Sequence, residues 1–198
     1  MNTVTSTLLT TTFSASLLLS LPTIALATPQ KWQLDVPKTN VDFEVAYFGS
    51  ASVKGQFHDI DGAINYDVKY PARTSINFTV KSSSVDTGSK IRDSFLRRKE
   101  LLNTAPYPAM TFASKKVTMI TPKEANVTGD FTALGQTKPL TVRVTLSDAI
   151  TDPSTKKSTL KFKATGLVDR YDYGVTAFSN MVGTKIPLII TGELVPAN

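Results

Sequence analysis

Cysteine is absent from the chain of 198 residues, so no disulfide bond can stabilise its fold. Histidine occurs once, as His58, and neither a Gly-x-Ser-x-Gly nor a His-Glu-x-x-His segment is present. A zinc site needs further ligands beside one histidine, and a hydrolytic nucleophile needs a base beside it. The sequence shows no recognisable motif for either. His58 stands beside Asp59 and Asp61, in a pattern more typical of a strand end than of a metal site. We therefore predict no metal ion and no enzyme cofactor.

Charge is missing from the first 27 residues, which contain no Lys, Arg, Asp or Glu. They hold a short apolar run over 16–21 and end in Ala25-Leu26-Ala27, the small-x-small pattern that a signal peptidase accepts. A membrane anchor is the alternative, but the run is far shorter than the roughly 20 apolar residues of a spanning helix. We predict a cleaved signal peptide over 1–27 and one mature domain over 28–198, in the periplasm or secreted.

All 22 basic and 16 acidic residues follow residue 27, so the net charge of +6 belongs to the predicted mature domain. A basic domain favours anionic headgroups, phosphates or nucleic acid. The local excesses, at 97–99, 115–116 and 156–163, are typical of solvated faces. Because an exported chain rarely meets nucleic acid, we expect no nucleic-acid partner. We expect any contact with an anionic membrane surface to be transient.

Most of the mature chain alternates between apolar and polar residues, a period of two that indicates half-buried strands. The alternation is clearest over 41–47, where acidic residues separate the first apolar ones. It predicts further strands over 53–58, 62–68, 76–81, 110–119, 125–133, 140–146, 160–164 and 184–194. Many short strands separated by turns predict an antiparallel barrel or sandwich. Charged residues on the outer face disfavour a barrel embedded in lipid.

Residues 89–103 depart from this period and place Ile91, Phe95 and Leu102 on one helical face. Ser89 is a suitable N-cap, and two prolines soon after the segment prevent the helix from continuing. We predict a short helix between two strands, positioned to act as a lid over an open barrel end.

Phenylalanines and glycines share the positions that the alternation assigns to the interior. The phenylalanines are Phe43, Phe57, Phe78, Phe112, Phe131 and Phe162, and the glycines among them include Gly55, Gly129 and Gly166. Large rings beside glycines can interdigitate into a solid core or leave a channel. Composition alone does not choose between the two.

A series of short motifs runs through the chain in a fixed order. They are Trp32, VDFEV (41–45), VKGQF (53–57), VDTG (85–88), IRD (91–93), YPAMTF (107–112), VTGDFT (127–132), TKPL (137–140) and DRYDYG (169–174). This order resembles the YceI-like family, lipocalin-like polyisoprenoid-binding proteins of bacteria, over nearly all of residues 28–198. The resemblance implies an all-β fold, an extended antiparallel barrel of about eight strands with one short helical cap. It also implies a non-enzymatic homodimer that holds a long isoprenoid lipid, such as a quinone tail or polyprenyl phosphate, in the lumen.

The sequence departs from the family pattern at two histidines. Where relatives commonly have His-Leu-Gly, this chain has Tyr47-Phe48-Gly49, and where they commonly have Arg-Asp-x-His-Leu it has Arg92-Asp93-Ser94-Phe95-Leu96. A headgroup contact made by imidazole therefore does not carry over. The mouth of the cavity here is expected to prefer a less polar or differently charged headgroup.

The expected ligand contacts are apolar along the tunnel and polar at its mouth. Arg92 offers a fixed fork of donors to a phosphate or quinone oxygen, and Asp93 is placed to orient it; a plain surface pair on the helix is the equal alternative. The predicted lining residues are Phe43, Val45, Phe57, Ile76, Phe78, Phe95, Phe112 and Phe131. For each of these, plain core packing is the favoured alternative.

The segment DRYDYG (169–174) gathers two acids, an arginine and two tyrosines before a glycine. We predict a structural corner formed by Arg170, Tyr171, Asp172 and Gly174, in which the arginine bridges to an acid and the glycine permits the turn. The alternative is a hydrolytic enzyme acting on a lipid or glycan through Asp169, Asp172 or His58. It lacks a recognisable nucleophile beside a base, so we expect a binding protein.

Overall fold

The computed structural model describes residues 30–49, 51–66 and 70–197. The predicted signal peptide over 1–27 lies outside the described residues and stays a prediction. Among the helices that are described, none has the length and apolarity needed to cross a bilayer.

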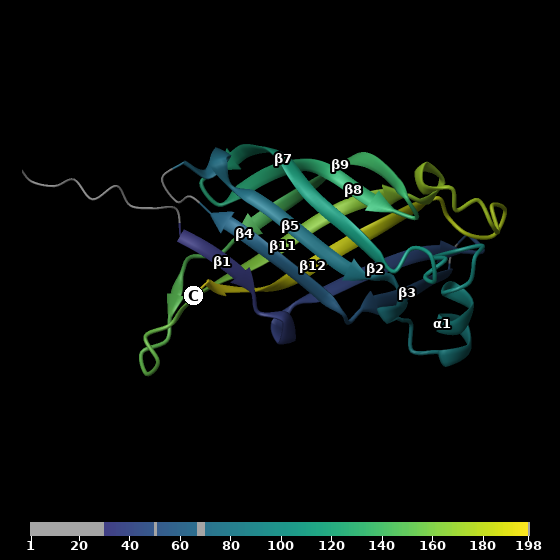
Figure 1. The fold of residues 1–198 in the computed structure, drawn as a ribbon, viewed down its shortest axis with the longest axis horizontal. Coiled ribbons are helices and arrows are strands. Elements are labelled where there is room, and N and C mark those ends of the chain that lie inside the picture. Colours follow the sequence, from purple (N-terminus) through teal and green to yellow (C-terminus); the bar gives the residue numbers. More distant parts are fainter. Residues whose placement is uncertain (1–29, 50, 67–69, 198) are drawn as a thin grey trace, which may run out of the picture.

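Within the described residues the chain folds as an antiparallel barrel of eight long strands, as predicted (Figure 1). Three of the eight are interrupted once, so they are labelled as the pairs β1 and β2, β3 and β4, and β5 and β6. The strands are β1 (Gln30–Leu34), β2 (Asn40–Tyr47), β3 (Ala51–Phe57), β4 (Ile60–Tyr66), β5 (Ser75–Lys81), β6 (Val85–Asp86), β7 (Ala109–Thr121), β8 (Glu124–Ala133), β9 (Gln136–Leu146), β10 (Ile150–Thr151), β11 (Ser158–Asp169) and β12 (Lys185–Pro196). The two-residue β10 only adds a short hairpin to β11.

The last strand, β12, closes the barrel. Along one edge it pairs with β11, from Leu160 opposite Leu194 to Asp169 opposite Lys185. Along its other edge it pairs with β2 and then with β1. Each remaining long strand pairs with the strands before and after it in the chain. This up-and-down closure satisfies the backbone groups that an open sheet would leave unpaired at its edges.

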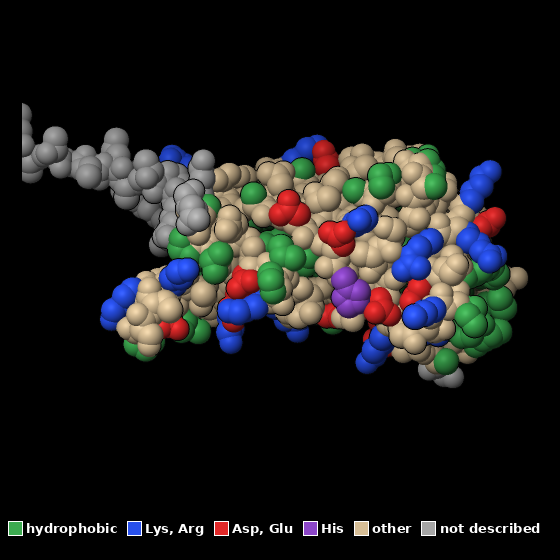
Figure 2. Space-filling model, turned by 60° about the horizontal axis from the view of Figure 1, so that its bottom comes forward, with side chains coloured by type: hydrophobic (Ala, Val, Ile, Leu, Met, Phe, Trp, Pro, Cys, Tyr) green, Lys and Arg blue, Asp and Glu red, His purple; other side chains and the backbone are tan. Residues whose placement is uncertain are grey.

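Buried side chains form three separate groups along the wall instead of one central core. They are Val41, Phe57, Ile60, Val80 and Val85; Trp32, Leu34, Leu160 and Leu194; and Ala133, Val168 and Tyr173. Figure 2 shows Lys, Arg, Asp and Glu side chains dispersed over one face of the molecule. Cross-strand ion pairs such as Lys115 with Asp130, at 2.6 Å, lie on the outer side of the wall.

Strand β7 changes which residues face inward partway along its length. Its pairing with β8 shifts register between Ser114 and Lys116, and again between Met119 and Thr121. Phe112 therefore faces the interior before the first shift, and Val117 faces it afterwards. The simple alternation in the sequence does not reveal these two bulges.

The one α-helix among the described residues, α1 (Lys90–Leu96), is shorter than the predicted 89–103. Ser89 occupies the N-cap position, although its side chain makes no capping hydrogen bond. Beyond Leu96 the chain folds back through turns, and Asn103 adopts a positive φ of 43°. Arg97 fixes this reversal, because its Nε and Nη2 donate to the carbonyls of Ser83 and Val85 at 2.7 and 2.8 Å.

In the part of the chain that the structure describes, short 3-10 helices occupy four of the connections: η1 (Val36–Lys38), η2 (Pro71–Arg73), η3 (Ser82–Ser84) and η4 (Arg170–Tyr173). Helix α1 and the segment between η4 and β12 lie at the same end of the barrel (Figure 1). We call this the α1 end. The turn between β7 and β8 lies at the opposite end.

Candidate functional site: the barrel interior

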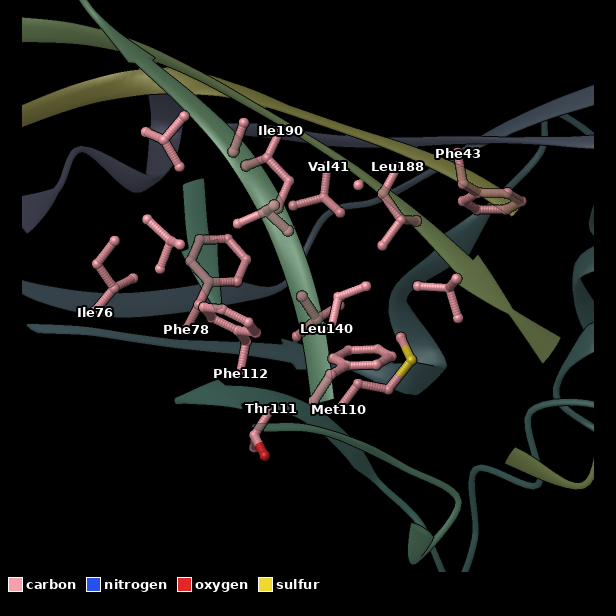
Figure 3. Close-up of a pocket in the computed structure, with 18 of the residues that line it drawn as sticks. Val41, Phe43, Ile76, Phe78, Met110, Thr111, Phe112, Leu140, Leu188 and Ile190 are labelled. Atoms are coloured by element: carbon pink, nitrogen blue, oxygen red, sulfur yellow. The ribbon is translucent and has the colours of Figure 1, made fainter. Parts of the chain in front are cut away.

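The barrel encloses a cavity of about 310 Å³ that reaches from one end of the wall to the other. Nearly all of its lining is aliphatic or aromatic, and the labelled side chains in Figure 3 come from strands on different sides of the barrel. This volume lies at the lower end of the roughly 300 to 1,000 Å³ that ligand sites occupy. The interior is therefore a channel and not a filled core.

Pairs of phenylalanine and glycine on neighbouring strands explain why the interior stays open. In the register of the sheet Phe78 lies opposite Gly62, and Phe162 lies opposite Gly192. A Cβ atom on Gly62 would lie 3.1 Å from the Phe78 ring, and one on Gly192 would lie 3.0 Å from the Phe162 ring. Each ring thus leans over the neighbouring strand, in the space that a side chain would fill. The wall is lined while the middle remains empty.

Seven of the eight predicted lining residues do line this cavity: Phe43, Val45, Phe57, Ile76, Phe78, Phe112 and Phe131. Phe95 is the exception and requires a correction. Its side chain is 36% exposed, and its ring packs 5.7 Å from that of Phe178 on the outside of the α1 end. Whether the seven bind a ligand stays a prediction.

Arg92 and Asp93 lie outside the cavity lining. Asp93 is buried, and its Oδ1 accepts hydrogen bonds from the Thr87 N–H at 2.9 Å and the Thr87 hydroxyl at 2.6 Å. The guanidinium of Arg92 donates to the same hydroxyl and to the Thr87 carbonyl, each at 2.7 Å. Both side chains therefore hold the connection between β6 and α1, and their donors and acceptors turn toward Thr87 instead of a ligand.

The α1 end is closed by a buried arginine. Arg170 is 4% exposed, borders the cavity, and donates to four backbone carbonyls, at distances of 2.6 to 3.0 Å. The acceptors are Val175, Ala177, Val182 and Gly183. The predicted bridge from Arg170 to an acid is therefore replaced by carbonyls, which satisfy the charge without a second buried ion.

The rest of the DRYDYG segment forms a tight corner around this arginine. Gly174 caps η4 with a φ of 80°, a conformation that a residue with a side chain adopts only under strain. Tyr173 is buried with its ring 5.3 Å from that of Phe131, and burial, together with nearby Asp172, raises the pKa of its phenol. Tyr171 and Asp172 stay exposed.

At the opposite end, polar lining side chains come from the β7–β8 turn and the η2 region. Thr74 and Tyr66 lie there with Lys123 and Glu124. Nζ of Lys123 pairs with Asp148 at 2.6 Å, and the hydrogen bond from Arg143 lowers the pKa of Glu124. The hydroxyl of Thr74 is buried and has no hydrogen-bond partner among the described residues. Polar groups of the wall are thus concentrated at its two ends.

The residues of the enzyme alternative are engaged separately. Nε2 of His58 lies 3.0 Å from Asp86 Oδ2, at the junction of β3 and β4. Asp169 pairs with Lys185 at 2.9 Å, at the far end of β11. Among the described residues, no three His, Cys, Asp or Glu side chains lie close enough together to hold a metal ion. The described residues therefore assemble no catalytic group from His58, Asp169 and Asp172.

Several lining residues were missed by the sequence prediction. Met110, Leu140, Leu188 and Ile190 point into the cavity in Figure 3, and Leu96, Leu101 and Leu102 border it near α1. The alternation over 184–194 carries the signal for Leu188 and Ile190. Leu96 ends α1, and Leu101 and Leu102 reach the cavity through the fold-back after it, which the sequence pattern does not predict.

The sequence is similar to that of known bacterial proteins. The sequence profile of the YceI-like domain matches residues 32–194. Protein YceI of Escherichia coli O157:H7 is 35% identical over 153 residues, which cover 77% of this chain and 79% of that protein. The Salmonella arizonae Protein YceI is 34% identical over the same shares.

Solved structures share the fold. Campylobacter jejuni YCEI protein has a TM-score of 0.67 and 25% identity, covering 75% of this chain and 87% of that one. Burkholderia cenocepacia BcnA has a TM-score of 0.73 and 21% identity, with 83% and 99% covered. A polyisoprenoid binding domain from Saccharophagus degradans, implicated in plant cell wall breakdown, has a TM-score of 0.63 and 13% identity. The match covers 84% of this chain and 98% of that one. Given the profile match over most of its length, this chain belongs to the YceI-like family.

Proposed function

We propose that this protein binds a long isoprenoid lipid, a quinone tail or a polyprenyl phosphate, inside its barrel and carries it. The observation that supports this most strongly is the continuous apolar cavity along the barrel axis. A branched hydrocarbon chain is the ligand whose shape and polarity fit such a lining. A structural relative described as a polyisoprenoid binding domain supports the same class of ligand.

Burial of the tail supplies most of the binding free energy in this proposal. Each CH₂ group removed from water contributes about 0.8 kcal/mol. A neutral hydrogen bond to the headgroup contributes only about 1 kcal/mol. A tail of about ten buried carbons therefore outweighs every polar contact at either end. Chain length is then the main determinant of affinity, and the polar groups at the two ends adjust headgroup preference.

We also propose that the carrier works in the periplasm or outside the cell, as a homodimer. The uncharged leader over 1–27, whose small-x-small end resembles a cleavage site, supports export, and the family resemblance supports the homodimer. Mass spectrometry of protein from its native host should find a mature chain beginning at Thr28, and sedimentation equilibrium should give twice the monomer mass. A retained leader, or a monomer at all concentrations, would remove these two parts of the proposal.

Lipid carriage is tested by native mass spectrometry and by titration with quinones of increasing tail length. We expect long-chain quinones or polyprenyl phosphates to remain bound, and affinity to rise with tail length. Phe78→Asp should abolish binding, because it places a charge in the apolar lining. Phe78→Trp, which adds bulk and no charge, should weaken long tails more than short ones.

The matched control is Thr79→Asp, which adds the same charge to the exposed face of β5. It should bind like the unaltered protein. If folded Phe78→Asp protein binds long tails normally, or if no lipid binds to any variant, the proposed function is wrong.

A further inference from the structure

Five large apolar side chains are exposed together at the α1 end, and we call them the aromatic patch. They are Tyr47, Phe48, Ile91, Phe95 and Phe178. Ile91 is 86% exposed and Phe48 is 61% exposed. Exposed apolar side chains scattered singly are ordinary, but a contiguous group marks an interaction surface.

Contacts in the structure join the patch into one surface. The rings of Tyr47 and Phe48 lie 4.5 Å apart, and those of Phe95 and Phe178 lie 5.7 Å apart. The N–H of Phe48 donates to the carbonyl of Met181, whose own N–H donates to the carbonyl of Phe178. On α1, Ile91 precedes Phe95 by four residues and so shares its face.

The patch lies directly outside the end of the cavity. Leu96 and Ala177 border the cavity, and their chain neighbours Phe95 and Phe178 belong to the patch. Tyr47 forms a backbone bridge with Val182, which also borders the cavity. These segments therefore turn some side chains toward the tunnel and the neighbouring side chains toward solvent.

Positive charge lies beside these apolar side chains, on α1 and the residues that follow it. Residues 90–100 carry five Lys or Arg and two Asp or Glu, a net charge of +3. Lys90, Arg92, Arg98 and Lys99 are exposed, and the guanidinium of Arg98 lies 5.2 Å from the Phe95 ring centre. Figure 2 shows hydrophobic side chains gathered at this end, with Lys and Arg at their edges.

We propose that the aromatic patch and its basic rim dock the protein on the surface of an anionic lipid bilayer. Aromatic rings settle at the headgroup level of a bilayer, and nearby Lys and Arg are attracted to anionic lipids. A second copy of this chain fits less well, because two facing patches would bring the two basic rims together. Docking needs no bound cargo. If the proposed lipid carriage also holds, docking aligns the tunnel end with the membrane.

Co-sedimentation of the mature protein with vesicles tests this directly. We expect binding to vesicles of phosphatidylcholine mixed with phosphatidylglycerol, and much weaker binding to phosphatidylcholine alone. Added salt should reduce the binding, since screening weakens attraction to the anionic surface. Phe48→Asp and Ile91→Asp should each raise the apparent dissociation constant for the vesicles about tenfold, a change equivalent to 1.4 kcal/mol, and Arg98→Glu with Lys99→Glu should act similarly.

Ile150→Asp is the matched control, because Ile150 is 51% exposed and lies on β10, at the other end of the barrel. It should bind vesicles as the unaltered protein does. Equal binding to both vesicle types, or Ile91→Asp binding like the control, would overturn the docking proposal. So would conversion of a dimer into monomers by Ile91→Asp, which would assign the patch to self-association. No isoprenoid is present, so failure of docking is distinct from failure of lipid carriage.

Discussion

At the scale of single residues, the width of the tunnel depends on phenylalanines that lean over a glycine of the next strand. Phe43 and Gly55 form such a pair between β2 and β3. The sequence predicted that both residues face inward, but their pairing depends on the register between strands. For that reason, composition left the choice between a channel and a solid core open.

Gly55→Ala should narrow the tunnel. The added methyl group would meet the Phe43 ring and the Thr87 methyl group, at 2.9 Å from the latter, so the ring must swing into the lumen. We expect a loss of about 1 to 3 kcal/mol in unfolding free energy, the usual cost of overpacking. Binding of long tails should weaken as well. Denaturant unfolding and lipid titration measure the two effects.

Combining Phe43→Leu with Gly55→Ala should restore part of the unfolding free energy and part of the tail binding, since the leucine removes the clashing ring edge. Ser52→Ala, on the exposed side of β3, serves as the control and should change neither quantity. A Gly55→Ala protein with unaltered stability and binding would contradict the role assigned to this pair.

Asp169 gives the α1 end a dependence on pH. The hydrogen bond from Lys185, followed by that from the Tyr171 N–H, lowers the pKa of Asp169 below its ordinary value of 3.8. A carboxyl with a lowered folded-state pKa stabilises the fold above its unfolded-state pKa and loses this effect as pH falls through the folded-state value. Asp169→Asn keeps an oxygen for Tyr171 but loses the ion pair.

We therefore expect Asp169→Asn to be less stable than the unaltered protein at neutral pH, with the difference shrinking as the pH falls below 3.8. Thermal unfolding at a series of pH values measures it. Asp169→Ala, which also loses the capping oxygen, should be the less stable of the two variants at neutral pH. A stability difference that does not vary with pH would show that the ion pair with Lys185 is not its source.

At the scale of elements, most strands follow from alternation, because one face of each strand is apolar. The exceptions are β1, β6 and β10, and two of these contain only two residues, too few to show a period. The predicted helix over 89–103 is wrong beyond Leu96, because Arg97 makes tertiary hydrogen bonds to Ser83 and Val85 that local sequence does not encode.

The segment between η4 and β12 depends on one side chain for its closed form. Arg170→Lys keeps the positive charge but cannot donate to four carbonyls, and each buried carbonyl left without a donor costs about 1 to 3 kcal/mol. We expect a loss of roughly 3 kcal/mol in unfolding free energy. Faster amide hydrogen exchange should be concentrated in residues 174–184.

The exposed Arg73→Lys is the comparison for this substitution, since Arg73 lies in η2, near the other end of the barrel. Its exchange rates over 174–184 should match those of the unaltered protein. Unchanged exchange in Arg170→Lys would mean that other contacts hold this end closed.

At the scale of the whole molecule, the eight-stranded barrel and the family could both be predicted from ordered motifs and alternation. The actual contacts of Arg92 and Asp93 could not be predicted from the sequence, because they depend on the position of Thr87, which follows β6. The exposed position of Phe95 was missed for a similar reason. A helical face has two possible partners here, the tunnel and the solvent, and periodicity does not distinguish them.

The central claim is that the apolar cavity holds a long isoprenoid chain. A crystal structure of the mature protein saturated with a long-chain isoprenoid quinone tests it most directly. We predict continuous tubular electron density beside Phe78 and Phe112, extending along the axis toward Arg170 at the α1 end. A lumen filled by collapsed side chains, with the quinone absent or bound only to the outer surface, would contradict the account.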